Sequence, residues 1–317
     1  MAKIRYLVHY SIIKENTRII EQLNQPCALL FFGLVKHFHD IALPAIHRNI
    51  AGPNKHCDIY LHTYNITESK VNPRNGEDVA ARLKPAEAFL LTDNVTMDTV
   101  QEFMIQRGEF LNHTRKQNYM GWGDCCTSHD NMIQQWHSIQ GVWNLMIQSE
   151  EQILSKKAHG IDVHGPYYQQ IGLFRTDTYQ VTPIDIFDSD AALPNFAHNA
   201  GYNDRMFYGT RQNAAIWADR FAFSNIFETI YNPKERRHHG YHSETYLKYL
   251  MKHYKVPVEL KLICMWRIRS RGRLQGKDCR DLKRYSLSTN ILEVAPPGYV
   301  VEGEFLAPPI GGEQHSI

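Results

Sequence analysis

Residues 27–35 read CALLFFGLV, and this uninterrupted apolar run decides the fold. A run so short, apolar at every position, is typical of a strand that is buried on both faces of a parallel sheet. Apolar residues then recur at helical spacing from Phe38 to Ile50, until a Gly-Pro-Asn turn at residues 52–54. Residues 57–63, CDIYLHT, predict a second strand. Strand, helix and strand in this order form a βαβ unit, which predicts a parallel sheet.

Strand and helix patterns continue to alternate along the chain. Short apolar segments at residues 89–91, 170–175 and 259–267 predict further strands, and residues 206–209 predict a strand edge. The clearest helix lies at residues 129–155. Its apolar stripe has five members at helical spacing: Met132, Trp136, Ile139, Trp143 and Met146.

The ends of that helix, and a second helix, complete the prediction. Ser128 is expected to cap the long helix and Gly160 to end it, while Gln135 and Gln140 lie off its apolar stripe and could reach a ligand. Residues 243–253 predict the second helix. We therefore expect an α/β fold, with a mostly parallel central sheet and helices on both of its faces.

Composition narrows the possible partners. The 317 residues carry 35 Lys and Arg against 33 Asp and Glu, a formal net charge of +2. That near balance argues against a nucleic-acid partner, because dedicated nucleic-acid binders are normally basic. The longest uncharged apolar run, residues 28–35, is far shorter than the roughly 20 residues that cross a bilayer, so no membrane span is expected.

The cysteines favour a reducing compartment. Six are spread irregularly, and none belongs to a Cys-x-x-Cys pair. This pattern predicts neither a disulfide framework nor a structural zinc site. Because no signal peptide can be read in the first 25 residues, we expect a cytoplasmic protein. Three glycosylation sequons, at Asn65, Asn94 and Asn112, carry little weight in such a protein.

Ligands of open α/β sheets bind at the carboxyl ends of the strands, which singles out three places. They are the turn after residue 35, residues 62–65, and the tripeptide Arg-Thr-Asp at residues 175–177. The tripeptide is the most informative, because a buried strand there ends in a cation and a carboxylate. Such a carboxylate can hold a divalent metal, and the arginine can bind phosphate oxygens. The alternative is a structural Arg–Asp pair that caps the strand.

The order of these segments resembles GT-A-type glycosyltransferases, in particular small nucleotide-sugar transferases of polysaccharide and capsule synthesis. The segments are the βαβ opening, CDIYLHTYN, the long Trp-bearing helix, FRTD, TPIDIFDSD and GYNDRMFYGT, and the likeness spans roughly residues 27–270. It implies a GT-A-like catalytic domain over residues 27–290, preceded by an extension over 1–26 and followed by an extended tail over 291–317. The implied reaction moves a sugar from a nucleotide-diphosphate donor to a hydroxyl of a carbohydrate or glycoconjugate acceptor.

The resemblance also implies a metal. The family's Asp-x-Asp motif binds a divalent cation that bridges the donor's diphosphate, and here an arginine replaces the first carboxylate. Mn²⁺ or Mg²⁺ is then expected on Asp177, with His242 as a further ligand and Arg175 on the diphosphate. Residues 188–190 spell Asp-Ser-Asp literally, but they follow Pro183 and are expected in a surface loop.

Two carboxylates are candidates for catalysis. The resemblance implies that the segment around Asp204 faces the acceptor, where the carboxylate could deprotonate the attacking hydroxyl. The alternative for Asp204 is an Asn-Asp turn that caps the next helix. Glu244 lies in the first turn of the helix at residues 243–253, where it either reaches into the cleft or only balances the helix dipole. The sequence does not decide between inversion and retention.

Basic residues and the first strand ends complete the expected donor site. Arg267 and Arg269 alternate at the end of a predicted strand and so point to one face, where they could stabilise the leaving diphosphate. A solvated basic surface or an RNA contact are the alternatives, although no aromatic residues that would stack on bases are interleaved there. The nucleotide is expected near Gly33, Thr63 and Tyr64.

The predicted function is therefore a glycosyltransferase, with two alternatives. One is a non-catalytic member of the same fold that binds a nucleotide or a glycan, because the acidic motif is incomplete. The other is a metal-dependent hydrolase of the phosphodiesterase type. That class needs several His and Asp residues at consecutive strand ends, and only His62 and Asp177 qualify.

Overall fold

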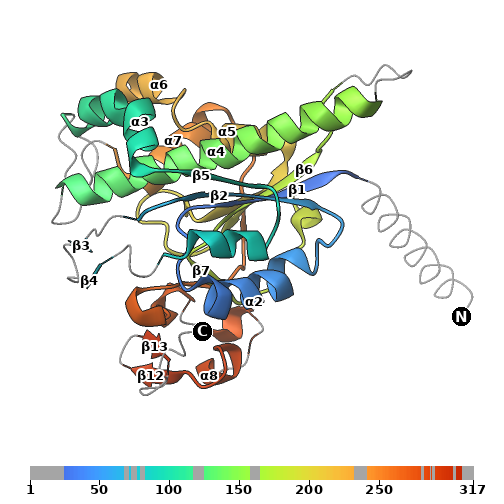
Figure 1. The fold of residues 1–317 in the computed structure, drawn as a ribbon, viewed down its shortest axis with the longest axis vertical. Coiled ribbons are helices and arrows are strands. Elements are labelled where there is room, and N and C mark those ends of the chain that lie inside the picture. The colour runs from blue at the N-terminus through green and yellow to red at the C-terminus, as the bar shows by residue number, and fades with distance from the viewer. Residues whose placement is uncertain are drawn as a thin grey trace, which may run out of the picture.

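The computed structural model describes residues 25–67, 71–72, 77–78, 83–116, 125–157, 165–231, 241–279, 282–285, 287, 290–302 and 305–308. A seven-stranded sheet forms the centre of this part of the chain, in the order β10-β8-β9-β6-β1-β2-β5 (Figure 1). Its strands are β1 (Cys27–Phe32), β2 (Asp58–Tyr64), β5 (Val95–Asp98), β6 (Gln170–Arg175), β8 (Ala191–Pro194), β9 (Met206–Thr210) and β10 (Glu259–Lys261). Neighbouring strands are parallel except where β9 pairs with β6 and β8. The predicted α/β fold with a mostly parallel sheet is confirmed.

Strand β1 shows why the apolar run lies at the centre of the sheet. Side chains alternate across a strand, so an apolar run can supply two cores at once. Cys27, Leu29 and Phe31 belong to the core on one face, whereas Ala28, Leu30 and Phe32 belong to the core on the other. Strand β2 lies parallel to β1, which confirms the predicted βαβ unit.

Five helices of the described chain cover one face of the sheet (Figure 1). They are α3 (Val100–Arg115), α4 (Cys125–Lys157), α5 (Arg211–Ala218), α6 (Ser224–Ile230) and α7 (Ser243–His253). Helix α4 carries the predicted stripe, of which Trp136, Ile139 and Met146 are fully buried. It begins at Cys125 rather than at Ser128, and its predicted end at Gly160 lies outside the described residues. None of the described helices has the length and apolar character needed to cross a bilayer.

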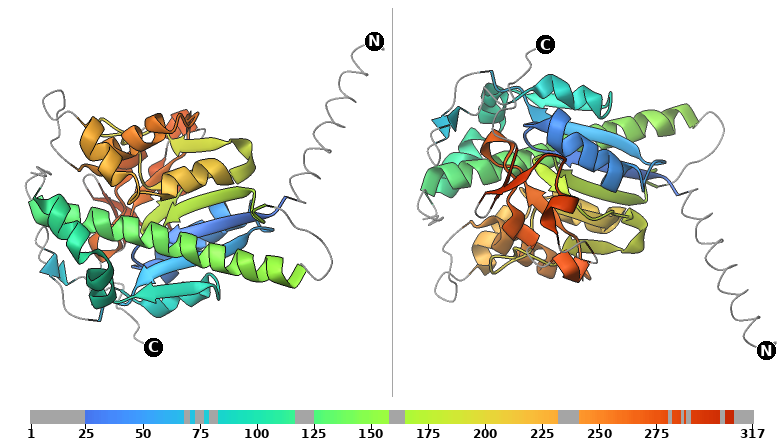
Figure 2. Two further views of the ribbon diagram at one scale, coloured as in Figure 1. Left: turned by 90° about the horizontal axis from the view of Figure 1, so that it is seen from above. Right: turned by 90° about the horizontal axis from the view of Figure 1, so that it is seen from below.

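Shorter elements cover the opposite face, which Figure 2 shows in the view from below. A π-helix (Phe38–Ala42), α2 (Leu43–Ile46) and a second π-helix (His47–Ala51) follow one another after β1. A two-stranded ribbon, in which β11 (Met265–Arg267) pairs with β7 (Thr178–Gln180), adds the buried Trp266 to the same core. Helical elements therefore lie on both faces, as predicted.

Two strand predictions are wrong, and the strand predicted at residues 259–267 is divided into β10 and β11, which belong to different sheets. Phe89 and Leu90 end a 3-10 helix (Pro85–Leu90) and are about half exposed, at 53% and 51%. Pro85 favours the start of a helix, because its ring fixes φ near the helical value. The strand beside β2 is β5 instead. Residues 206–209 form an interior strand, β9, rather than an edge.

The C-terminal tail is not simply extended. It contains α8 (Ile291–Val294) and a hairpin of β12 (Val300–Glu302) and β13 (Phe305–Ala307). Leu306 is buried and forms a β-bridge with Leu274. The described part of the tail therefore packs on the main core. A further two-stranded ribbon consists of β3 (Val71–Asn72) and β4 (Glu77–Asp78).

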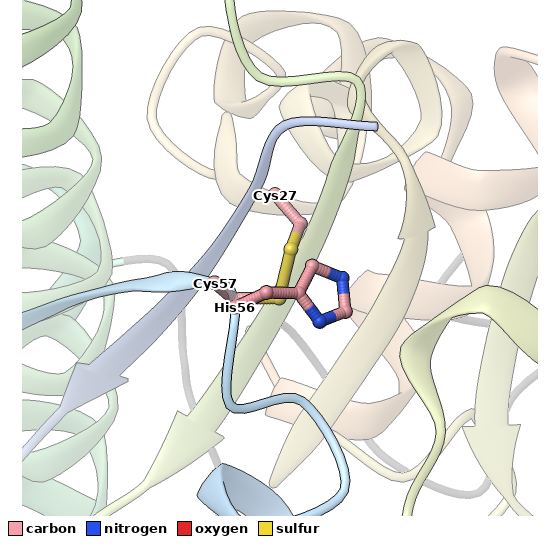
Figure 3. Close-up of side chains that lie close together, drawn as sticks. All are labelled: Cys27, His56 and Cys57. Atoms are coloured by element: carbon pink, nitrogen blue, oxygen red, sulfur yellow. A yellow bond between two sulfur atoms is a disulfide. The ribbon is translucent and has the colours of Figure 1, made fainter. Parts of the chain in front are cut away.

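Two disulfides join four of the six cysteines. Cys27, the first residue of β1, is bonded to Cys57, which directly precedes β2 (Figure 3). Cys264 is bonded to Cys279. The prediction that the cysteines form no disulfides is wrong, because the register of neighbouring strands brings Cys27 and Cys57 together and sequence spacing does not reveal it. The argument from the cysteines for a reducing compartment is lost with that prediction, and the cytoplasmic location stays a prediction.

Candidate functional site

The topology gathers the predicted site at the carboxyl end of the sheet. Strands β1 and β6 run parallel, so the residues that follow them meet at one end. Strand β9 is antiparallel to β6, so the residues that precede β9 lie at the same end. Arg175 donates its backbone N–H to the carbonyl of Arg205, which joins the two segments. The sheet thereby brings together four predicted residues, the strand-end cluster of Arg175, Asp177, Asp204 and Glu244.

Arg175 and Asp177 form a bidentate ion pair. Arg175 donates from Nε to Asp177 Oδ1 at 2.8 Å and from Nη2 to Oδ2 at 2.7 Å. Lys36 Nζ lies 4.0 Å from the same Oδ2. Burial alone would raise the pKa of Asp177, but the charges of Arg175 and Lys36 hold it well below its usual range. The side chains remain 23% and 16% exposed, so a ligand can reach the pair.

Asp204 is held beside this pair. Gln135 of α4 donates to Asp204 Oδ2 at 3.1 Å, and its carbonyl oxygen accepts from Arg175 Nη1 at 3.5 Å. Ser243 Oγ also donates to Asp204 Oδ2. Burial raises the pKa of Asp204, but the guanidinium groups of Arg175 and Arg205 outweigh burial and lower it. Asp204 is therefore a carboxylate anion held by hydrogen bonds, and it does not cap the next helix, α5, whose N-cap is Thr210.

Glu244 has the opposite electrostatic behaviour. Its side chain, 12% exposed, accepts a hydrogen bond from Asn199 Nδ2 at 2.9 Å. Burial, reinforced by the negative charge of Asp204, raises the pKa of Glu244 to about 7. Two neighbouring carboxylates whose pKa values are pushed apart are the usual arrangement of an acid–base site. Near neutral pH, Glu244 can both take up and release a proton.

The segment before β9 is fixed to the start of α7 by a close backbone approach. Tyr202 donates its N–H to the carbonyl of Glu244 at 2.9 Å. A Cβ on Gly201 would lie 1.8 Å from that carbonyl oxygen, so only glycine fits there. Asn203 then accepts from the N–H of Arg205 at 3.0 Å and turns the chain into β9. These contacts set the spacing between Asp204 and Glu244.

A buried arginine that the sequence analysis missed lies near this segment. Arg220 is fully buried, stacks over Trp217 and donates from Nε to its carbonyl. Its two Nη atoms have no hydrogen-bond partner among the described residues. Burial lowers the pKa of Arg220 to about 10, and the charge of Asp204 partly opposes this shift. Arg220 therefore contributes to the positive potential that keeps Asp204 ionised.

The residues predicted to bind the nucleotide differ in accessibility. Gly33 has φ of 106° and donates its N–H to Ser138 Oγ, so the turn after β1 needs glycine. Thr63 is completely buried and accepts from the N–H of Val35. Tyr64 is 3% exposed and donates to the carbonyl of Gln134. The side chains of Thr63 and Tyr64 thus hold the turn and α4 in place, and neither presents a surface to a ligand.

Arg267 and Arg269, which were predicted to point to one face of a strand, have different surroundings in the structure. The charge of Arg269 helps to lower the pKa of Asp177, so it belongs to the surroundings of the strand-end cluster. Arg269 also donates from Nε to Gln275 at 2.8 Å. Arg267 lies in the β11–β7 ribbon, opposite Thr178. The two arginines therefore do not continue one strand, because β11 ends at Arg267.

The literal Asp-Ser-Asp motif at residues 188–190 lies at the other end of the sheet. It precedes β8, which has the same direction as β6, and therefore lies where parallel strands begin. Asp188 accepts from Tyr208 Oη at 2.7 Å and pairs with Lys261. The motif is thus separated from the strand-end cluster by the length of the strands.

The residues expected to hold a divalent metal do not fit one in this arrangement. Both oxygens of Asp177 accept from Arg175 and Lys36 Nζ lies 4.0 Å from Oδ2, so a cation would meet a carboxylate whose charge is already balanced. The other expected ligand, His242, caps α7 through Thr245 and has its Nε2 3.5 Å from Glu244 Oε2. A metal on Asp177 would compete with a charge-assisted bidentate contact, which is among the strongest hydrogen bonds in proteins.

A second cluster, His62, Asp98 and His137, lies at the carboxyl end of β2 and β5. Asp98 Oδ2 is 3.2 Å from His62 Nε2 and 2.5 Å from His137 Nε2. Hydrogen bonds from these histidines, His62 first, outweigh burial and lower the pKa of Asp98 to about 2. The three groups could also act as metal ligands. However, Arg107 donates to His137 Nδ1 at 3.2 Å, which favours a proton on His137 Nε2 where a metal would bind.

This second cluster borders a polar cavity of about 230 Å³ between α4, α3 and β5. Amide side chains line it on the helices, namely Gln106, Gln140, Asn144 and Gln148. Gln140 was predicted to reach a ligand, and it does face this cavity, although Arg107 already donates to its side chain. Asp98 and His137 were not predicted, since neither belongs to a recognisable motif.

A third group of potential ligands is already used by a disulfide. Cys27, His56 and Cys57 lie close together, but the two sulfur atoms are bonded to each other (Figure 3). His56 stacks on Phe187 instead. This group is therefore structural.

The chain matches no protein-family model and no curated protein. Its function must consequently be inferred from the geometry of the strand-end cluster.

Proposed function

We propose that this protein is a GT-A-like glycosyltransferase, which moves a sugar from a nucleotide-diphosphate donor to a hydroxyl of a carbohydrate or glycoconjugate. The observation that carries the proposal is the pair of neighbouring carboxylates at the carboxyl end of the sheet, Asp204 with a lowered pKa and Glu244 with a pKa near 7. Ligand sites of parallel sheets occupy this end. The side chains also match the needs of a reaction that separates an anionic leaving group from a sugar and deprotonates an alcohol.

The donor's diphosphate would bind at Arg175. Lys36 and Arg269 add positive charge around the same carboxylate, so the site has more cations than Asp177 alone neutralises. A diphosphate can take over one of the guanidinium hydrogen bonds now made to Asp177, because arginine binds carboxylate and phosphate with the same planar geometry. Positive groups in place before the reaction stabilise the charge that develops on the leaving diphosphate.

Glu244 would act as the base. The acceptor hydroxyl attacks the anomeric carbon of the sugar and the bond from that carbon to the diphosphate oxygen breaks. The hydroxyl proton passes to the Glu244 carboxylate. A pKa of about 7 suits this step, because the group is substantially ionised at neutral pH and still basic enough to accept the proton. Asp204 would stay ionised throughout and support the positive charge of Arg175 and Arg205.

No step of the proposed reaction passes through a divalent metal. A metal-bridged diphosphate is the arrangement that the resemblance implies, and the occupied oxygens of Asp177 argue against it. The expected Mn²⁺ or Mg²⁺ therefore stays a prediction, and arginine and lysine side chains supply the positive charge in the proposed mechanism.

Thermal-shift titration with a panel of nucleotide-diphosphate sugars, each with and without Mn²⁺, tests donor binding. We expect at least one donor to raise the melting temperature in EDTA, and Arg175→Gln to abolish that shift. Arg48→Gln is the matched control, because Arg48 bonds to Tyr179 away from the cluster. Absence of a shift with every donor, or an unchanged shift in Arg175→Gln, would contradict the proposal.

A non-catalytic nucleotide- or glycan-binding protein is the second candidate. The Arg175–Asp177 ion pair favours this candidate, because a pair that only caps the end of a strand can be present in a protein that catalyses no reaction. The two candidates differ in turnover. A catalyst releases nucleoside diphosphate from the donor that binds best, whereas a binding protein returns that donor intact.

A further inference from the structure

The three sequons lie in different structural surroundings. Asn112 lies within α3, and the hydroxyl of its partner Thr114 is buried against the carbonyl of Phe110. Asn65, which is exposed, follows β2 at the carboxyl end of the sheet and donates its backbone N–H to the carbonyl of Asp98. Asn94 is exposed in the turn that precedes β5. An N-linked glycan is bulky and belongs on exposed loops, which leaves Asn65 and Asn94 as the two candidates.

The side chain of Asn94 can carry a glycan without loss of its contact. Asn94 Nδ2 donates one hydrogen bond, to the carbonyl of Ile59 at 3.1 Å. An amide nitrogen has two N–H groups, so substitution of the second leaves this bond in place. The turn itself is supported by Thr92, which donates from its hydroxyl to the same carbonyl. A glycan would therefore project from a turn that is already fixed.

The two disulfides indicate an oxidising compartment, and a sequon is glycosylated only in proteins that enter one. Cys27–Cys57 and Cys264–Cys279 have all four residues buried, at most 8% exposed. Disulfides of this structural kind form and persist in oxidising compartments, and are rare where glutathione keeps thiols reduced. Asparagine-linked glycans are added in secreted proteins. Two independent features, the paired cysteines and an exposed sequon, thus indicate one compartment.

We propose that the chain matures in an oxidising compartment and carries an N-linked glycan on Asn94. The glycan reaches the protein from a polyprenyl-diphosphate-linked oligosaccharide. A new bond forms between Asn94 Nδ2 and the anomeric carbon, the bond from that carbon to the diphosphate breaks, and the amide proton leaves with the transferase's base. Each disulfide forms when two thiols lose two protons and two electrons to a disulfide-exchange oxidoreductase. The oxidising compartment does not depend on the proposed sugar-transfer activity, whereas the choice of Asn94 over Asn65 rests on it, because a glycan on Asn65 would lie at the ligand side of the sheet.

The placement also suits the strand-end cluster. Asn94 lies at the amino end of β5, whereas Asp98 at the other end of that strand borders the ligand side of the sheet. A glycan on Asn65 would project at that ligand side. The glycan expected on Asn94 leaves it open.

Peptide mapping of the natural protein tests both parts. The protein is isolated from its source cells after free thiols have been blocked with an alkylating reagent, and digested without reduction. We expect linked peptides for Cys27–Cys57 and Cys264–Cys279, and a glycosylated Asn94 peptide that glycosidase treatment converts to Asp. Alkylated Cys27 and Cys57 would overturn the oxidising compartment. Intact disulfides with unmodified Asn94 would overturn the glycan.

A pair of variants keeps the glycan test independent of folding. The full chain is expressed through the secretory pathway of a eukaryotic cell as wild type, Asn94→Gln and Thr96→Ser. We expect the electrophoretic shift upon glycosidase treatment to be smaller in Asn94→Gln than in wild type, and to be retained in Thr96→Ser, which keeps the sequon. An equal shift in wild type and Asn94→Gln would show that Asn94 carries no glycan.

Discussion

The two ends of the central sheet are built from the same strands and differ in how their polar groups are satisfied. At the amino end, Cys27 and Cys57 are joined covalently, and Asp188 accepts from Tyr208. At the carboxyl end, Arg175 and Asp177 form an ion pair, Asp204 and Glu244 accept hydrogen bonds from neutral side chains, and the side chains of Arg175, Asp177 and Glu244 remain partly exposed. The disulfide at the amino end is a covalent bond that a phosphate or a hydroxyl cannot exchange. The carboxyl end consists of contacts that these groups can replace.

The difference shows that the two ends of a parallel sheet can have different roles, one in stability and the other in ligand binding and catalysis. Strand direction places loops with similar roles together at each end, so residues far apart in sequence come to share one end. Charge also distinguishes two carboxyl groups at the carboxyl end of the sheet, since Glu244 has a pKa near 7 while Asp98, the last residue of β5, has one near 2. Only the former can exchange a proton at neutral pH.

The largest effect is expected from Glu244→Gln. Loss of a general base typically lowers the rate by about 10²–10⁴-fold. We expect kcat for sugar transfer to fall within this range while the KM for the donor changes little, because Glu244 would contact the acceptor. Glu259→Gln, an exposed glutamate of β10, is the control and should leave kcat unchanged. Comparable kcat values in the two variants would remove Glu244 from the mechanism.

The second effect concerns the amino end of the sheet. Replacing Cys27 and Cys57 together by alanine removes a cross-link between residues 30 positions apart, which should lower the free energy of unfolding by about 3–4 kcal/mol. Urea unfolding measures this loss, and activity at low denaturant should be retained. If the folded variant lost sugar-transfer activity as well as stability, the two ends of the sheet would not have separate roles.

A smaller loss of stability is expected from Asp177→Asn. The amide has nearly the same shape as the carboxylate but leaves the charge of Arg175 uncompensated, at a cost of about 1–3 kcal/mol. Asp188→Asn at the opposite end, where the side chain is 42% exposed, should change stability by less than about 0.5 kcal/mol. Equal unfolding midpoints for the two variants would mean that the Arg175–Asp177 pair does not stabilise the strand end.

The smallest effect is expected from removal of metal. Because Arg175 occupies both oxygens of Asp177, sugar transfer in EDTA should proceed at the rate measured with Mn²⁺, within about twofold. Assays at matched ionic strength check this. A rate that rises tenfold or more with Mn²⁺ would show that the ion pair opens to bind a cation.

The sequence predicts the fold and the members of the site better than their roles. The apolar run at residues 27–35 is sufficient to predict the buried parallel strand β1. The Arg-Thr-Asp tripeptide is sufficient to predict the carboxyl end of the neighbouring strand, β6. Asp204 and Glu244 were equivalent candidates, because a pKa depends on burial and neighbours that appear only after folding. For the same reason, the sequence did not show that the side chains of Thr63 and Tyr64 are buried.

Two further features of the molecule have topological causes. The Asp-Ser-Asp motif precedes a strand that runs in the direction of β6, so it lies at the wrong end of the sheet for the site. The disulfide between Cys27 and Cys57 depends on strand register. Neither the direction nor the register of a strand can be read from local patterns.

The pH dependence of kcat/KM for sugar transfer, compared between wild type and Glu244→Gln, tests the proposed acid–base role most directly. A base must be ionised to act, so protonation of Glu244 should lower the wild-type value about tenfold for each pH unit below about 7. The residual activity of Glu244→Gln should lack this decline. If the variant retained the wild-type inflection near pH 7, another group would be the base and the proposed role of the strand-end cluster would be contradicted.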